Sequence, residues 1–146
     1  MKRMPWRCWL PALAAALCAT AAQGACLSGR PALADEFAQA TTVVVARVLS
    51  ARDVQDDPED PTGISATLYT ARVAERLRGA APALLELRSD NTARRFPMEP
   101  GQRYLLFVRR ARDGTLFIDP CGHSGALPQA RAALAQARRL AHASPR

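Results

Sequence analysis

The sequence predicts a mainly β domain of five strands, with a short helix before the strands and a longer helix after them. Segments that are rich in β-branched residues, or that alternate apolar and polar residues, recur through the middle of the chain. Short connections separate most of these segments, so successive strands should pair antiparallel. One apolar stripe with helical spacing closes the chain. A small closed or partly closed barrel fits this order of elements best.

The first 24 residues have the features of a secretory signal peptide. Basic residues come first, an apolar run follows over residues 10–22, and small residues surround Gly24. The run is too short to span a membrane comfortably, and no second run follows it. We therefore expect residues 1–24 to be removed. The mature chain should be periplasmic or extracellular and lack a transmembrane segment, with one domain over residues 25–142 and a disordered tail over residues 143–146.

The first predicted elements are a helix and two strands. Residues 31–40 begin with proline and carry acidic residues in their first half, as the start of a helix does. Residues 41–50 are dense in valine and threonine, which favours a buried strand. The acidic, proline-containing segment 52–63 is predicted to be an exposed loop. The alternating segment 64–78 is predicted to be a long strand that ends at Gly79.

Three further strands and a second helix complete the domain. The strands are predicted over residues 84–88, 103–110 and 115–119, with a polar loop after the first of them over residues 89–96. Asp113-Gly114 lies between the last two strands and predicts a tight hairpin. Residues 128–141 place alanine and leucine residues on one helical face. Five residues on the apolar faces of the best-patterned strands are predicted to lie in the core: Tyr69, Val73, Tyr104, Leu106 and Val108.

Two cysteines remain once the signal peptide is removed. Cys26 and Cys121 are an even pair in an oxidising compartment, which favours a disulfide over a metal site or a nucleophile. The bridge would tie the start of the mature chain to the end of the last strand. In the chain-entropy model a loop of this length contributes about 4–5 kcal/mol to stability.

The charge of the mature chain is modest. It carries 17 basic residues, all of them arginine, against 13 acidic residues, which is a net charge of +4. Basic and aromatic residues are not interleaved as they are in single-strand binders, so we expect no nucleic-acid partner. Arginine forks suit carboxylate, sulfate or phosphate groups, but an ordinary solvated surface is favoured at this net charge. The arginines that are candidates for an anion site are Arg72, Arg76, Arg94, Arg95, Arg109, Arg110 and Arg112.

The sequence offers little for catalysis. Only His123 and His142 could act as bases near neutral pH. His123 could pair with Ser124 or Asp119, but sequence neighbours rarely point at one another. We therefore expect no catalytic residues, and the chain is predicted not to be an enzyme.

Metal binding is also disfavoured. Cys121 and His123 would supply only two ligands in one loop, which makes a poor site. The acidic residues between positions 56 and 60 lack the spacing of an EF-hand loop, so a solvated loop is favoured over a calcium site. We expect no metal and no cofactor.

The order of several motifs resembles a known family. An early cysteine and a helix are followed by VVVARV, YTARVAERLRG, LLELRSD, GQRYLLFV, a D-G hairpin, LFIDPC and a closing helix. This order is similar to that of bacterial members of the tissue inhibitor of metalloproteinases family, from Cys26 to about Leu140. The resemblance implies a netrin-like module with an OB-fold barrel and a zinc metalloprotease as its protein partner.

The chain departs from the family at one disulfide. Family members open with Cys-x-Cys, and each cysteine is bridged into the barrel. Here Gly24 takes the place of the first cysteine, and the loop over residues 89–96 lacks its partner. Both halves of one bridge are therefore absent, whereas Cys26 and Cys121 retain the other.

This departure bears on the inherited mechanism. In the animal inhibitors the amino group and carbonyl oxygen of the N-terminal cysteine bind the protease zinc. Cleavage after Gly24 would leave Ala25 in front of Cys26, so we do not expect inhibition by that mechanism. Cleavage after Ala25 would restore an N-terminal cysteine, but it would place the bulky Gln23 where cleavage sites favour a small residue.

The sequence therefore predicts a secreted, monomeric, non-catalytic binding module. By the resemblance it is related to metalloendopeptidase inhibitors, and its partner contact is expected at Ala25, Cys26, Leu27 and Ser28. The alternative is a cell-envelope structural or interaction protein that binds a protein or a polyanionic partner.

Overall fold

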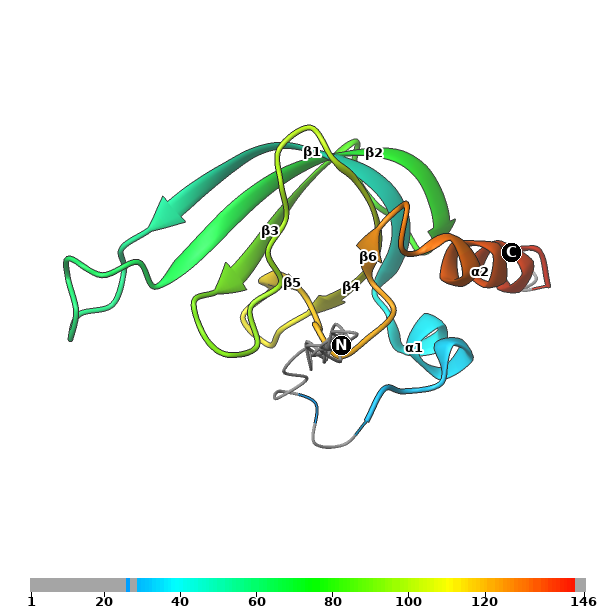
Figure 1. Ribbon diagram of the computed structural model, residues 1–146, viewed down its shortest axis with the longest axis horizontal. Coiled ribbons are helices and arrows are strands. Elements are labelled where there is room, and N and C mark those ends of the chain that lie inside the picture. The colour runs from blue at the N-terminus through cyan, green and yellow to red at the C-terminus, as the bar shows by residue number, and fades with distance from the viewer. Residues whose placement is uncertain (1–25, 27–28, 144–146) are drawn as a thin grey trace, which may run out of the picture.

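The computed structural model describes residue 26 and residues 29–143 (Figure 1). It consists of two helices and six strands: α1 (Leu33–Gln39), β1 (Thr42–Val54), β2 (Ala66–Arg78), β3 (Leu84–Asp90), β4 (Arg103–Arg110), β5 (Leu116–Ile118), β6 (Gly125–Ala126) and α2 (Arg131–Ala143). The predicted mainly β class, with a helix on each side of the strands, is confirmed. The expected signal peptide and residues 144–146 of the expected tail lie outside the described residues, whereas Ala143 ends α2.

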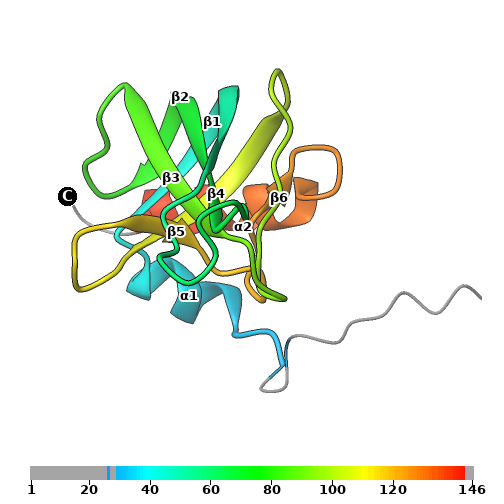
Figure 2. The same ribbon diagram turned by 90° about the vertical axis from the view of Figure 1, so that its left-hand side faces the viewer.

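All strand pairs are antiparallel and belong to one sheet, in the order β3-β2-β1-β4-β5. β6 lies outside this strand order and pairs with Tyr104 and Leu105 of β4. Cα atoms of the two edge strands, β3 and β5, approach within 8 Å of one another, and Figure 2 shows these strands on the same side of the molecule. No ladder joins them in the described part of the chain, so the sheet is not a closed barrel.

One core fills the concave side of this curled sheet. Its largest fully buried side chains come from β3 and β4, namely Leu85, Leu87 and Leu106. Four of the five predicted core residues are buried here, and Val73 is partly buried against the same cluster. Burial of these side chains holds β3 and β5 near one another without backbone pairing.

A second core lies between the opposite face of the sheet and the two helices. Val43, Val45, Leu105 and Phe107 are almost completely buried on this face. The apolar stripe predicted for the C-terminal helix packs here, with Ala137 fully buried. Figure 1 shows both helices at one end of the sheet, and α1 and α2 contact each other.

Arg78 joins α1 to the end of β2. Its guanidinium donates hydrogen bonds to the carbonyl oxygens of Ala38 at 2.7 Å and Ala40 at 3.3 Å, and it lies over the Phe37 ring. The last carbonyls of a helix have no partner within the helix, so Arg78 supplies one. This contact fixes the position of α1, which carries a residue of the candidate site.

Several elements differ from their predicted bounds. β3 continues to Asp90, although residues 89 and 90 were predicted to be loop, because Ser89 and Asp90 pair with Thr67 and Ala66 of β2. Three elements are shorter than predicted, namely α1 (Leu33–Gln39), β2 (Ala66–Arg78) and β5 (Leu116–Ile118). β1 continues to Val54, although residues 52–54 were predicted to be loop, because exposed residues there pair through their backbone with the start of β2. α2 begins at Arg131, after a turn, whereas a helix from residue 128 was predicted. β6 was not predicted, since two residues are too few for a periodic pattern.

Candidate functional site

The predicted disulfide joins the N-terminal segment to the end of the sheet. Cys26 is exposed, and its sulfur lies 2.07 Å from that of Cys121, with the Cα atoms 5.6 Å apart. Cys121 follows β5 by three residues. Of the predicted contact residues, Ala25, Leu27 and Ser28 lie outside the described residues, so the structure places only Cys26 on this surface.

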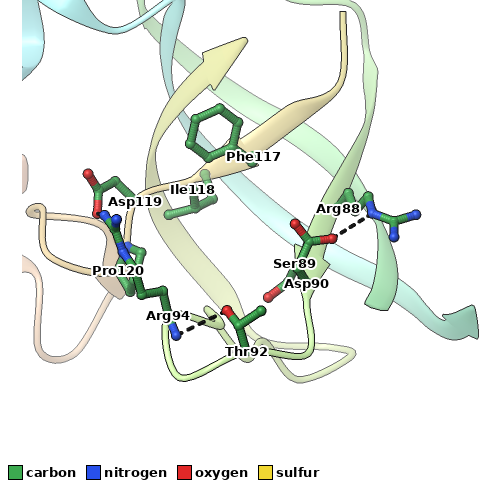
Figure 3. Close-up of a pocket in the computed structure, with 9 residues that line it drawn as sticks. All are labelled: Arg88, Ser89, Asp90, Thr92, Arg94, Phe117, Ile118, Asp119 and Pro120. Carbon is green, nitrogen blue, oxygen red and sulfur yellow. Dashed lines mark hydrogen bonds and ion pairs between the residues drawn. The ribbon is translucent and has the colours of Figure 1, made fainter. Parts of the chain in front are cut away.

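Asp119 connects this turn to two other elements. One of its carboxylate oxygens accepts the backbone N–H of Cys121 at 3.0 Å and lies 3.3 Å from a guanidinium nitrogen of Arg94. The other oxygen lies 3.8 Å from Arg109 of β4. Arg94 belongs to the loop between β3 and β4, so Asp119 holds that loop beside the disulfide-bonded turn. Figure 3 shows Arg94 and Asp119 facing each other.

A pocket of about 270 Å3 opens beside this ion pair, between the end of β3, the loop that follows it and β5. Phe117 and Ile118 contribute large apolar side chains, and most of the other lining residues are charged or polar (Figure 3). The pocket therefore lies where the two unpaired sheet edges meet, next to the turn that carries Cys121. Its lining residues are Arg88, Ser89, Asp90, Thr92, Arg94, Phe117, Ile118, Asp119 and Pro120.

Arg88 organises the far side of the pocket. Its guanidinium binds both carboxylate oxygens of Asp56, at 2.8 and 3.2 Å, and Asp90 at 2.7 Å. The hydrogen bonds from Arg88, together with one from Ser65, lower the pKa of Asp56 from 3.8 to about 2. The same two carboxylates raise the pKa of Arg88. This network ties the loop after β1 to β3.

A second polar contact lies behind the disulfide-bonded turn. Glu36 of α1 accepts the backbone N–H of His123 at 2.8 Å, and the same oxygen lies 2.7 Å from the ring nitrogen Nδ1. The side chains of Glu36 and His123 are 9% and 17% exposed. Gly122 is buried against this carboxylate, because a Cβ there would lie 1.9 Å from Glu36 Oε1.

Neither Ser124 nor Asp119 pairs with His123, as expected for neighbours along the sequence. Ser124 instead accepts the backbone N–H of Phe107, at 2.8 Å, and Asp119 binds the arginines. Glu36 was missed, although the sequence held a signal: it lies beside Phe37 on the apolar side of a short helix, where a carboxylate needs a partner. The contact positions a turn, and no nucleophile is hydrogen-bonded to His123 in the described residues.

The candidate arginines do not form one cluster. Arg94 and Arg109 meet at Asp119, whereas Arg76 and Arg110 donate hydrogen bonds to nearby backbone carbonyls. Arg95 donates to Asn91, and Arg112 is exposed in the hairpin between β4 and β5. Arg72 lies on β2 opposite an arginine of β1.

Two carboxylates of the acidic loop accept hydrogen bonds from backbone N–H groups of the same loop. Asp57 accepts the N–H of Glu59 at 2.9 Å, and Asp60 accepts that of Gly63 at 3.0 Å. Within residues 26 and 29–143 no three His, Cys, Asp or Glu side chains are grouped so that they could hold a metal ion. Over the same residues, no helix is long and apolar enough to cross a membrane.

Comparisons with protein-family models and curated proteins identify no relative of this chain. No protein-family model matches the chain, and no curated protein matches it significantly.

Proposed function

We propose that this chain is an exported, non-catalytic binding module of the netrin-like type, related to the tissue inhibitors of metalloproteinases. The OB-fold is a five-stranded, partly open Greek-key barrel. The order of the five longer strands and the approach of β3 to β5 support assigning the sheet to that fold. The Cys26–Cys121 disulfide supports export, because such bonds persist in oxidising compartments.

The observation that carries the proposal is that Cys26 and the β3–β4 loop are both attached to the turn that carries Cys121. The disulfide fixes Cys26 beside Cys121, and Asp119 bonds to both Cys121 and Arg94. In the family, a second disulfide joins the N-terminus to this loop. Here the Arg94–Asp119 ion pair makes a comparable connection without a cysteine. A surface held in place in this way loses little conformational entropy when a partner binds.

The module is proposed to bind a protein partner through this surface as a monomer, and zinc metalloproteases are the first class to test. Ala25, Leu27 and Ser28 would extend the contact from Cys26. Because Ala25 is expected to precede Cys26, we propose binding that does not depend on zinc chelation by a terminal cysteine. No catalytic role, metal or cofactor is assigned to any residue of this surface.

The test uses two forms of the mature protein, one that begins at Ala25 and one that begins at Cys26. Each is measured for binding to, and inhibition of, a panel of zinc metalloproteases. We expect the Ala25 form to bind at least one protease without potent inhibition. Inhibition by the Cys26 form alone would show that the position of signal-peptide cleavage determines whether the protein inhibits the protease. Potent inhibition by the Ala25 form would contradict the proposed role of the extra residue.

Two single variants locate the contact. Arg94→Ala removes the ion pair to Asp119, and Arg95→Ala removes a neighbouring exposed arginine whose side chain bonds to Asn91. We expect Arg94→Ala to weaken protease binding and Arg95→Ala to leave it unchanged. Equal binding by both variants and the wild type would exclude this surface. Absence of binding to every protease in the panel would exclude the protease-directed function.

A further inference from the structure

Three arginines stand side by side across the middle of the sheet. In the strand register, Arg47 of β1 is directly opposite Arg72 of β2 on one side and Arg103 of β4 on the other. Directly opposed residues project from the same face, with Cβ atoms about 4.5–5.5 Å apart. All three side chains are exposed. We call Arg72, Arg47 and Arg103 the arginine row.

The arginine row continues the face that the helices cover elsewhere. Along β4, Leu105 and Phe107 lie under the helices, and Arg103 is the next residue of that face. Arg47 follows Val43 and Val45 in the same way on β1. The row therefore begins where the helical cover ends, on a part of the sheet that faces solvent.

No carboxylate is hydrogen-bonded or ion-paired to the row within the described residues. Glu75 of β2 interacts electrostatically with Arg103 of the row. Its carboxylate, however, accepts two hydrogen bonds from Arg138 of α2, at 3.0 and 2.7 Å. The hydrogen bond from Arg138 lowers the pKa of Glu75 most, and the charge of Arg103 lowers it further. On β3, Leu84 lies opposite Arg72 and adds no charge, whereas Glu86, the next residue on that face of β3, lies opposite Thr70.

Three like charges in adjacent strands repel one another, so their pairing is unfavourable without a counter-charge. Elsewhere in the described chain, Arg88, Arg94, Arg109 and Arg138 each bind a carboxylate. The row differs from them because, among the described residues, no protein group accepts a hydrogen bond from its guanidinium groups. Such donors form forks that match phosphate and sulfate oxygens.

We propose that the arginine row binds a linear polyanion whose successive phosphate or sulfate groups each meet one guanidinium. The row extends over about 10 Å, which suits a chain of anionic groups better than a single ion. No aromatic side chain belongs to the row, and both tyrosines are buried. The row therefore offers no aromatic ring on which nucleic-acid bases could stack. This site shares no residue with the surface around Cys26 and Arg94, and it gives the alternative envelope function a specific location.

The experiment is calorimetric titration at low salt with two polyanions, tripolyphosphate and a sulfated oligosaccharide. The row variant Arg47→Gln/Arg72→Gln is compared with Arg30→Gln/Arg112→Gln, which removes two exposed arginines outside the row and so matches the loss of charge. We expect the row variant to bind at least about tenfold more weakly than the wild type, because charge-assisted hydrogen bonds are lost. The control variant should stay within about threefold.

The thermal midpoint without ligand separates binding from folding. We expect it to be unchanged or raised in the row variant, because the substitutions relieve repulsion. Binding of one polyanion but not the other would identify phosphate or sulfate as the natural group. Equal losses in both variants, no binding of either polyanion, or affinity for inorganic phosphate equal to that for tripolyphosphate would overturn the proposal. Tighter binding of an oligothymidylate of matched charge would overturn it too. The protease assay with Arg94→Ala tests the other surface independently.

Discussion

Glu36 and His123, which are 87 residues apart in the sequence, meet at one carboxylate oxygen. Glu36 Oε2 accepts the backbone N–H of His123 at 2.8 Å and lies 2.7 Å from its ring nitrogen Nδ1. Since Cys121 is two residues from His123, α1 and the disulfide hold the same turn from two directions. The rigidity of the proposed binding surface therefore depends on a buried polar contact as well as on the disulfide.

Loss of the Glu36 carboxylate should destabilise the fold. Glu36→Ala leaves the backbone N–H of His123 without its acceptor in a largely buried site, which should cost about 1–3 kcal/mol. Asp35→Ala is the matched control, because Asp35 is an exposed neighbour on α1, and it should change stability by about 0.5 kcal/mol or less. Urea denaturation measures both free energies of unfolding. Equal effects of the two substitutions would show that the contact contributes nothing to stability.

Gly122 should tolerate no side chain. A Cβ at this position would lie 1.9 Å from Glu36 Oε1 and 2.7 Å from its carboxyl carbon, so Gly122→Ala must displace Glu36 from His123. We expect a loss of about 1–3 kcal/mol. Gly125→Ala is the control, because its Cβ would make an ordinary contact at 3.7 Å with Ala130. If the clash with Glu36 is the cause, Gly122→Ala should lower the free energy of unfolding much less in a Glu36→Ala background. An equal loss in both backgrounds would exclude the clash as the cause.

The Cys26–Cys121 disulfide should be fully formed in the mature protein. Thiol labelling of the unfolded, non-reduced protein should find no free cysteine, and two labelled thiols would contradict the assignment. Replacing both cysteines by serine should lower the free energy of unfolding by about 2–5 kcal/mol, as for other small secreted domains. Differential scanning calorimetry of the two proteins measures this change.

Leu106 should contribute strongly to the concave core. Its side chain is 0% exposed, so Leu106→Ala should cost about 2–5 kcal/mol through lost burial and the cavity that remains. Leu84→Ala serves as the control, because Leu84 is 50% exposed on the edge strand. Chemical denaturation should show a small effect for Leu84→Ala, and a similarly small effect for Leu106→Ala would mean that the orientation of β4 is wrong.

The Asp56–Arg88 pair should give the loop after β1 an acid-sensitive attachment. Folding lowers the pKa of Asp56 from 3.8 to about 2, so folding favours the ionised form. The stabilisation is therefore present above about pH 4 and is lost as the pH falls toward 2. A carboxyl carbon NMR titration should find the low pKa in the wild type and a clearly higher one in Arg88→Gln, where the hydrogen bond from Ser65 remains. Arg94→Gln should leave it low, and an unchanged value in Arg88→Gln would contradict the assigned cause.

The sequence by itself determined the elements whose signal is local. The five longer strands, the helical stripe around Ala137 and the Asp113-Gly114 hairpin follow from residue type and short-range periodicity, which neighbours along the chain specify. The hairpin forms as predicted, with Gly114 at φ +91° and Asp113 accepting the N–H of Thr115. Export, inferred from the residues before Cys26, also favoured the pairing of Cys26 with Cys121, because no other cysteine remains in the expected mature chain.

Only the tertiary structure decided which distant residues meet. The pairing of Glu36 with His123 depends on where α1 packs, and the ion pair of Arg94 with Asp119 depends on where a loop crosses the sheet edge. The alignment of Arg47 with Arg72 and Arg103 depends on strand register, and a shift by one residue would turn these side chains to the opposite face. Register and packing are set by the whole core at once, so no single segment of the sequence carries them.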